Sequence, residues 1–218
     1  MKILSIHCGL PREVVWHGSH VTTSIFKQPV QGRVALRTLN LDGDRQSDLT
    51  VHGGRHKAVY CYPMEHYAYW AEELPDRTLE MGTFGENFTT EGLLEDSIHI
   101  GDRFAVGSAE VVVSQPRLPC YKLNIKFDSN DMTRRFLASR RTGFYLAVTR
   151  EGEVGAFDEF LPLSHDPNAV SISEITQLYL AKEYGEDDLH RVERALRVGA
   201  LPDSWKDYLR EKMNQRDA

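Results

Sequence analysis

The chain has 218 residues, of which 41% are hydrophobic and 10% aromatic, a size that suits one domain or one domain with a small appendage. The formal net charge of −6 excludes a protein that binds polyanions through bulk charge, so any anion site must be local and no nucleic-acid polymer is expected as a partner. No apolar run reaches about 18 residues and no signal-peptide pattern opens the sequence, so no membrane association is expected.

The cysteines indicate a reducing compartment. Cys8, Cys61 and Cys120 are widely spaced and odd in number, which argues against a disulfide framework. No Cys-x-x-Cys pair is present, so the sequence disfavours a zinc ribbon or a cysteine-held iron–sulfur cluster. We therefore expect a cytoplasmic protein.

The first half of the chain reads as short strands with one clear helix. The helix is predicted over residues 63–74, where apolar side chains recur at steps of three and four. Cys8 and Cys61 are expected to pack inside strands. Short strands separated by glycine and aspartate turns indicate a β-barrel or closed sheet, and they are predicted at residues 2–8, 21–26, 33–41, 58–62, 98–101, 103–106 and 109–114.

Two glycine-containing loops lie between these elements. In the first, His52-Gly53-Gly54-Arg55-His56-Lys57, successive amides and cationic side chains are compatible with an anion-binding nest, although this stretch by itself slightly favours a glycine hairpin with a solvated charged tip. In the second, Gly82-Thr83-Phe84-Gly85-Glu86-Asn87-Phe88-Thr89, the glycines allow backbone to approach a ligand and the polar residues offer donors and acceptors. This loop lacks the Gly-Lys-Ser/Thr of a phosphate-binding P-loop.

The most informative stretch follows the predicted strand at residues 109–114 and reads Gln115-Pro116-Arg117-Leu118-Pro119-Cys120-Tyr121-Lys122-Leu123. Two prolines stiffen the exit from the strand because each fixes φ and removes a backbone donor. Cys120 then stands between Arg117 and Lys122, whose positive charge favours the reactive thiolate. The alternative is a small buried hydrophobe, since free cysteine is among the most buried residue types.

The second half changes from mixed structure to helix. A short helix is predicted at residues 131–141, a strand at 144–149 and another strand at 154–160. Residues 163–168 form a plausible linker, so we expect a β-rich domain over 1–163 and a helical domain over 168–218. The helical part contains a capping-box spacing at Ser171-Ile172-Ser173-Glu174, an acidic helix start at Glu186 and a third helix at 202–213. Short helices of this kind should pack on each other, on the barrel or on a second subunit.

Together, three segments resemble the MOSC domains, which form the C-terminal domains of molybdenum-cofactor sulfurases and also occur alone. The segments run from Gly43-Asp44-Arg45-Gln46 to His52-Gly53-Gly54, then Gly85-Glu86-Asn87-Phe88, then the Pro-Arg-x-Pro-Cys-x-Lys-Leu motif ending at Leu123. The sequence is most similar to the YiiM-like branch, the N-hydroxylaminopurine-resistance proteins. This resemblance implies a mainly β fold with α, namely a MOSC β-barrel followed by a small C-terminal three-helix domain.

The resemblance also implies a site for the molybdenum cofactor, in which molybdenum is bound by molybdopterin. Cys120 matches the family's protein ligand to molybdenum, and a soft thiolate suits that metal. Arg117 and Lys122 would lower the thiol pKa and hold the anionic cofactor. The remaining implied site residues are a wall of Gly85, Glu86, Asn87 and Thr89 and a basic mouth of His52, Gly54, Arg55 and Lys57. The family commonly has an acidic residue where this chain has His56, so a role of that carboxylate cannot simply pass to His56.

The implied activity is the reduction of N-hydroxylated substrates, R-NHOH to R-NH2 and water, with Glu86, His52 or His56 delivering a proton. No flavin, nicotinamide or cluster motif is present, so electrons would come from a separate redox protein. Two alternatives remain: a cofactor-binding or sulfur-carrier module without turnover, and a thiol enzyme in which Cys120 pairs with His52 or His56. The helices would cap the pocket, form a homodimer or dock the electron donor, and dimerisation is favoured.

Overall fold

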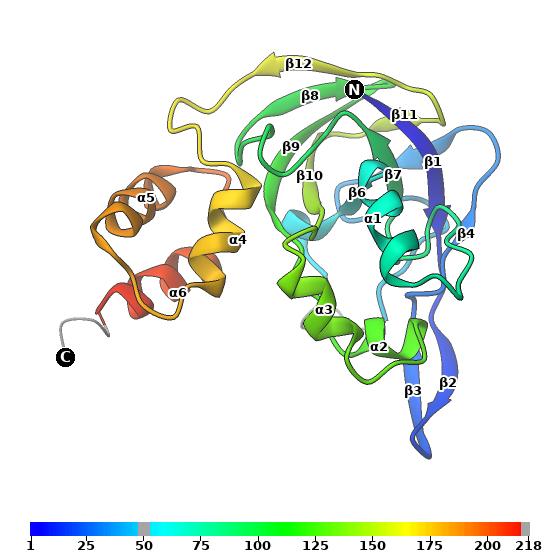
Figure 1. Cartoon of the computed structure of the whole chain (residues 1–218). Coiled ribbons are helices and arrows are strands. Elements are labelled where there is room, and N and C mark those ends of the chain that lie inside the picture. The colour runs from blue at the N-terminus through cyan, green and yellow to red at the C-terminus, as the bar shows by residue number, and fades with distance from the viewer. Residues whose placement is uncertain (48–52, 215–218) are drawn as a thin grey trace.

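The computed structural model describes residues 1–47 and 53–214 of the chain, and its centre is a curled eight-stranded sheet (Figure 1). The strand order is β12-β8-β9-β10-β6-β7-β1-β4. In chain order these strands are β1 (Lys2–Cys8), β4 (Gln28–Pro29), β6 (Val59–Pro63), β7 (Phe88–Glu91), β8 (Arg103–Val106), β9 (Ala109–Pro116), β10 (Phe144–Arg150) and β12 (Phe160–Ser164).

The curl brings the two sides of the sheet together. The amide of Ile3 donates to the carbonyl of Asp158 at 2.9 Å, and the amide of Phe157 donates to the carbonyl of Ile3 at 2.7 Å. The segment that leads into β12 thus pairs with β1 from the other side of the molecule. Neighbouring strands are antiparallel apart from β6 and β7, which run parallel. The closed sheet expected from the sequence is confirmed in this curled form.

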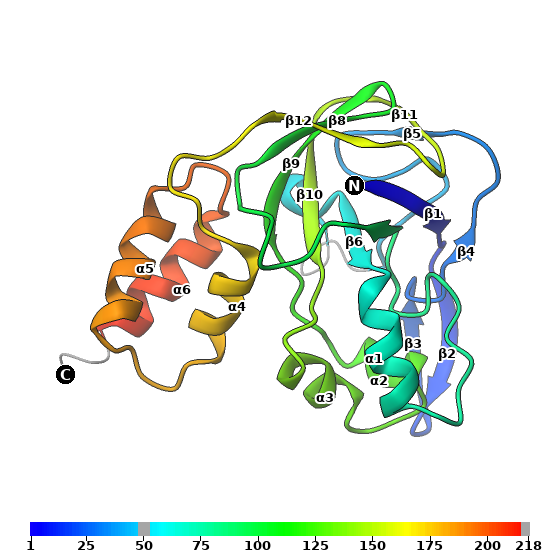
Figure 2. The same ribbon diagram turned by 45° about the horizontal axis from the view of Figure 1, so that its top comes forward.

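Two small ribbons accompany the main sheet. β2 (Arg12–Trp16) and β3 (Ser19–Thr23) form a hairpin that projects away from the sheet in both views (Figures 1 and 2), and β5 (Val34–Leu36) pairs with β11 (Gly152–Val154). The strand predicted at residues 154–160 is wrong, because a turn containing Phe157 at φ 70° separates β11 from β12. The stretch at 98–101 is also not a strand and makes a single β-bridge, from His99 to Ser171.

Three short helices cover one end of the sheet around an aromatic core. They are α1 (Glu65–Glu73), α2 (Lys122–Lys126) and α3 (Met132–Ala138), which lie near one another in Figure 2. Trp70 stacks on Phe136 with ring centroids 5.7 Å apart, and Tyr62 packs 4.6 Å from Phe84. The helix predicted at 63–74 is confirmed, except that Pro63 ends β6 and does not open the helix.

The C-terminal segment is helical, as predicted, and packs against β9. Its helices are α4 (Ile172–Leu180), α5 (Glu186–Arg197) and α6 (Asp203–Asn214), with α4 lying between the sheet and α5 (Figure 1). The capping box at the start of α4 is confirmed: the amide of Glu174 donates to Ser171 Oγ at 3.0 Å, and the amide of Ser171 donates to Glu174 Oε2 at 2.9 Å. Ile175 and Leu209 belong to the same buried cluster as Val111 of β9. The division into two domains stays a prediction. No helix in the described ranges is long and apolar enough to cross a membrane.

Candidate functional site

The Pro-Arg-x-Pro-Cys motif lies at the end of β9, where the chain leaves the sheet. Pro116 is the last residue of β9 and pairs with Phe144 of β10. The amide of Arg117 still donates to the carbonyl of Gly143 at 3.3 Å, and the chain then turns into α2. Since a proline cannot extend the ladder of hydrogen bonds, the sequence ends the strand here. The turn leaves Arg117 buried and Cys120 half-buried.

A first cavity of about 100 Å³ opens beside this turn. Among the described residues its charged lining consists of Lys27, Lys57, Arg117 and Lys122 against the single carboxylate of Asp44. The cavity is therefore positive, although the whole chain carries a net charge of −6. We call it the cationic cavity. Its described lining residues are Thr23, Ser24, Ile25, Lys27, Asp44, Gln46, Ser47, Lys57, Tyr60, Gly85, Asn87, Arg117, Cys120, Lys122 and Tyr145.

Arg117 is the most unusual residue of the cationic cavity. Its residue surface is 6% exposed, and its Nη1 has no hydrogen-bond partner. The guanidinium lies over Tyr60 and Phe136, at 4.8 Å and 5.1 Å from the ring centroids, and within residues 1–47 and 53–214 no carboxylate pairs with it. Burial disfavours its charge, but the facing Tyr60, Tyr145 and Cys120 outweigh burial and raise its pKa. A buried cation without an anionic partner is costly, so the arrangement suits an anionic ligand.

A buried polar network supports the opposite wall. Asp44 forms an ion pair with Lys27, and the exposed fractions of the two side chains are 1% and 9%. Asp44 also accepts hydrogen bonds from the amide of Gly9 at 2.8 Å and from Asn87 Nδ2 at 2.9 Å. Asn87 Oδ1 accepts from the amide of Tyr60 at 3.1 Å. Asp44 is thus a scaffold residue with satisfied acceptors, and it holds Lys27 at the cavity.

Of the predicted wall, Gly85 and Asn87 line the cationic cavity, whereas Glu86 and Thr89 do not. The Glu86 carboxylate accepts hydrogen bonds from the amide of Gly82 at 2.8 Å, from the amide of Phe84 at 3.0 Å and from Thr89 Oγ1 at 2.9 Å, and it also accepts one from the hydroxyl of Tyr67. Glu86 and Thr89 are both fully buried. The geometry therefore gives no support for Glu86 as a proton donor or for Thr89 as a cavity residue.

A second cavity of about 350 Å³ lies between the end of β9 and the C-terminal helices. We call it the aromatic cleft. Cys120, Lys57 and Tyr145 line both cavities, so the thiol stands where the two meet. The described lining of the aromatic cleft is Lys57, Gln115, Pro116, Leu118, Pro119, Cys120, Tyr145, Tyr179, Ser204, Trp205 and Tyr208.

Gln115 ties the motif strand to its neighbours. Its Oε1 accepts from Trp205 Nε1 of α6 at 2.7 Å, and its Nε2 donates to the backbone carbonyl of His56 at 3.1 Å. Ser114 Oγ donates to the same carbonyl at 2.7 Å. The motif strand thus positions α6 on one side and the short helix η1 (Arg55–Lys57) on the other.

The predicted basic mouth is only partly brought to the thiol. Gly54 and Arg55 are exposed, and neither belongs to the described lining of the cationic cavity or the aromatic cleft; His52 lies outside the described residues. The His56 side chain also lines neither cavity, and burial followed by the charge of Arg55 lowers its pKa. A Cys120–His56 pair is therefore not formed.

Lys57 and Lys122 are the predicted cations that do reach the site. Lys57 lines both cavities, and burial lowers the pKa of its ammonium group. Lys122 is buried, and its Nζ donates to Ser47 Oγ at 2.7 Å. Sequence reasoning missed Lys27 and Tyr145, because neither belongs to a motif and each comes from a distant strand or loop.

The other two thiols are structural. Burial, followed by the charge of Asp44, raises the pKa of Cys8 to about 11. Burial also raises the pKa of Cys61 well above its usual value. Both cysteines pack in the strands predicted to hold them, and Cys120 is the thiol that faces the cavities.

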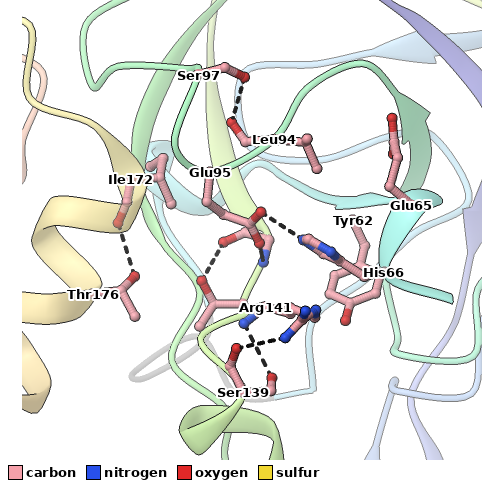
Figure 3. Close-up of polar contacts among 12 residues, drawn as sticks. Tyr62, Glu65, His66, Leu94, Glu95, Ser97, Ser139, Arg141, Ile172 and Thr176 are labelled. Carbon is pink, nitrogen blue, oxygen red and sulfur yellow. Dashed lines mark hydrogen bonds and ion pairs between the residues drawn. The ribbon is translucent and has the colours of Figure 1, made fainter. Parts of the chain in front are cut away.

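Glu95 connects His66 of α1 to the segment that precedes β10, and Figure 3 shows its contact with His66. Glu95 Oε2 lies 2.7 Å from His66 Nε2, and Glu95 Oε1 accepts from the amide of Gly143 at 2.7 Å. Gly143 has φ 63°, and a Cβ there would come within 2.3 Å of the Cys61 carbonyl oxygen, so only glycine fits. Since the Gly143 carbonyl accepts from the Arg117 amide, Glu95 is linked to the Arg117 backbone through Gly143 alone.

Known proteins share this architecture. Residues 48–160 match the model of the MOSC domain family. The chain is 38% identical over 205 residues to YflK of Bacillus subtilis, covering 94% of this chain and 91% of that protein. The crystal structure of YiiM from Geobacillus stearothermophilus has a TM-score of 0.80 at 31% identity, covering 97% of this chain and 98% of that one. A protein of Gibberella moniliformis named as a reductase is 33% identical over 140 residues, which cover 63% of this chain and 25% of that protein.

Proposed function

We propose that this chain, which belongs to the MOSC domain family and to its YiiM-like branch, binds the molybdenum cofactor and reduces N-hydroxylated compounds to amines. The reaction is R-NHOH + 2 e⁻ + 2 H⁺ → R-NH2 + H2O, with N-hydroxylaminopurine-type bases as the substrate class. The fungal relative named as a reductase supports a redox role, and it shares only part of its length with this chain.

The observation that carries the proposal is the buried Arg117 beside the half-buried thiol of Cys120. A guanidinium that has an unpartnered Nη1 and lines a cavity with three lysines suits an anionic cofactor. Cys120 would be the protein ligand to molybdenum, and Arg117, Lys27 and Lys122 would hold the anionic groups. Gly85 and Asn87 would face the pterin. When bound, the cofactor would supply the two-electron redox chemistry of this reaction.

The side chains near Cys120 suit a metal whose other ligands come from its cofactor. In the parts of the chain that the structure describes, no cluster of three His, Cys, Asp or Glu side chains could hold a metal ion by itself. A single soft thiolate is a suitable protein ligand for a metal already held by sulfur atoms of its cofactor.

The proton for the leaving hydroxyl group would come from Lys57 Nζ. Lys57 lines both cavities beside Cys120, whereas Glu86 and His56 line neither. Burial lowers the pKa of Lys57, which brings an ammonium group closer to the range in which it can release a proton. After proton release, the neutral amine would be recharged from solvent.

The electrons would come from a separate redox protein. The sequence contains no nicotinamide, flavin or iron–sulfur motif that could supply them within the chain. A cytoplasmic reductase that carries its own flavin or cluster fits this need. A homodimer formed through the C-terminal helices stays part of the proposal.

The test is a turnover assay on protein from a host that makes the cofactor. The loss of 6-N-hydroxylaminopurine would be followed with reduced viologen as the electron source. The wild type and a Cys8→Ala variant should both reduce the substrate, and Cys120→Ala should lose activity while it stays folded. Full activity in Cys120→Ala would contradict the proposal.

A sulfur-carrier role is the second candidate, because a thiol open to two cavities and flanked by cations also suits a persulfide. Cyanide would take the outer sulfur of such a persulfide and release thiocyanate and the free Cys120 thiolate. A stoichiometric thiocyanate yield that is lost in Cys120→Ala, together with no reduction of hydroxylamines, would favour the carrier role over the enzyme.

A further inference from the structure

The aromatic cleft differs in chemistry from the cationic cavity that it meets at Cys120. Within the described lining of the cleft, Lys57 is the only charged side chain, and most of the others are aromatic or apolar. Its volume of about 350 Å³ lies in the range of about 300–1,000 Å³ that is typical of small-molecule sites. Two cavities that meet at one thiol suggest two ligands of different character.

The C-terminal helices supply the aromatic wall of this cleft. Tyr179 comes from α4, and Trp205 and Tyr208 come from α6. Facing them are Leu118 and Pro119 of the motif turn, whose stiffness is set by the two prolines. The cleft therefore exists only because the helices pack against the end of β9.

The aromatic rings of the wall are held in place by hydrogen bonds and by one another. Trp205 Nε1 donates to Gln115 at 2.7 Å, and the Tyr208 hydroxyl donates to the carbonyl of Tyr179 at 3.2 Å. The ring centroids of Tyr179 and Tyr208 are 5.3 Å apart, and those of Tyr179 and Trp205 are 5.8 Å apart in an edge-on contact. Rings fixed in this way lose little freedom when a ligand binds, which favours stacking of a flat molecule.

We propose that the aromatic cleft binds the planar ring of the substrate and that Tyr208 and Tyr179 select flat heteroaromatic hydroxylamines over aliphatic ones. A ring in the cleft would carry its N-hydroxyl group towards Cys120 and Lys57, which line both cavities. The helical segment is then part of the substrate site. The reaction itself rests on the proposed function, but ring binding can be measured without cofactor or turnover.

The test compares adenine, which is flat, with cyclohexanecarboxamide, which is not flat and is also uncharged, by calorimetry on the cofactor-free full-length chain. Tyr208→Leu removes the ring, and Tyr208→Phe keeps the ring and removes only the hydroxyl. Tyr121→Leu is the matched control, because Tyr121 is 52% exposed next to Cys120 and lines neither cavity. Ser204→Trp is a second variant at an exposed position, chosen to fill the cleft without disturbing the core.

We expect adenine to bind more tightly than cyclohexanecarboxamide. Its Kd should rise about tenfold in Tyr208→Leu and stay within about twofold in Tyr208→Phe and Tyr121→Leu, as expected for the loss of one stacked ring. Ser204→Trp should abolish binding. Equal binding of both probes, no binding of adenine, or unchanged adenine binding in both Tyr208→Leu and Ser204→Trp would overturn the inference.

The two proposals fail in different ways. If the reductase assay fails while adenine binding depends on Tyr208 as expected, the cleft inference stands and the reaction is wrong. If the wild type reduces aromatic and aliphatic hydroxylamines equally well and Tyr208→Leu leaves both rates unchanged, the reaction stands and the cleft inference is wrong.

Discussion

Replacing Arg117 by methionine tests whether this buried cation serves to bind a ligand or to stabilise the fold. In the ligand-free protein the unsatisfied Nη1 destabilises the fold by about 1–3 kcal/mol. The contacts with Tyr60 and Phe136 act in the opposite direction, at about 0.5–2 kcal/mol each. These contributions nearly cancel, so Arg117→Met should change the free energy of unfolding by less than about 1.5 kcal/mol, whereas breaking a buried ion pair would cost about 3–5 kcal/mol.

The assay is urea unfolding with and without pyrophosphate. A ligand present at about 100 times its Kd stabilises the protein that binds it by about 2.7 kcal/mol. Wild type should gain stability with pyrophosphate and Arg117→Met should not. Arg141→Met is the control, because Arg141 also lies over a ring, 3.9 Å from the Tyr69 centroid, yet lines neither cavity. A loss above about 3 kcal/mol without anion, or a full pyrophosphate response in Arg117→Met, would refute the reasoning.

Three further predictions test the scaffold and the proton donor. Asp44→Asn should lower the free energy of unfolding by about 3–5 kcal/mol because it breaks a buried ion pair, while Asp42→Asn, which loses an exposed pair, should cost less than about 1 kcal/mol in the same urea titration. If the Lys57 ammonium group is the proton donor, kcat should fall as the pH rises through the pKa of Lys57, which burial lowers. Lys57→Arg should lose most of the activity, and its remaining activity should no longer fall over that pH range. An unchanged pH profile in the variant would exclude Lys57 as the proton donor. Gly85→Ala should lower the thermal unfolding midpoint more than Gly54→Ala. Both glycines have a positive φ, but only a Cβ at Gly85 would clash with a neighbouring isoleucine, at 2.7 Å. Equal changes in the two midpoints would contradict a steric clash at Gly85.

Much of the fold follows from local patterns in the sequence. The capping box at Ser171 predicted the start of α4, and the acidic residues at Glu186 predicted the start of α5. The strand predicted at 154–160 failed because its apolar residues flank a turn, and residue type alone does not reveal the positive φ of Phe157. In the hairpin of β2 and β3, the strand predicted at 21–26 overlaps β3, whereas β2 was missed because most of its residues are exposed.

The candidate site was predictable only where one motif contains it. Arg117, Cys120 and Lys122 are close in sequence and line the cationic cavity together. Glu86 was expected there as well, but its carboxylate accepts hydrogen bonds from the amides of its own loop. The motif does not predict this orientation of the side chain. Lys27 comes from a segment far from the motif, so only the fold brings it to the cavity.

The aromatic cleft could not be predicted either, because it forms between the motif turn and helices that follow it by more than fifty residues in the chain. The helix predicted at 202–213 was expected to pack on a neighbour, but its sequence did not indicate that Tyr208 would line a cavity. The hydrogen bond between Trp205 and Gln115 is one of the contacts that join the two regions.

The most direct test of the central claim is the ratio of molybdenum to protein in wild type and Cys120→Ala, purified in the same way from a host that makes the cofactor. We predict close to one molybdenum per wild-type chain and almost none in Cys120→Ala, with Cys8→Ala retaining the wild-type ratio. Equal molybdenum content in wild type and Cys120→Ala, or active wild-type protein without molybdenum, would contradict the assignment of Cys120 as the metal ligand.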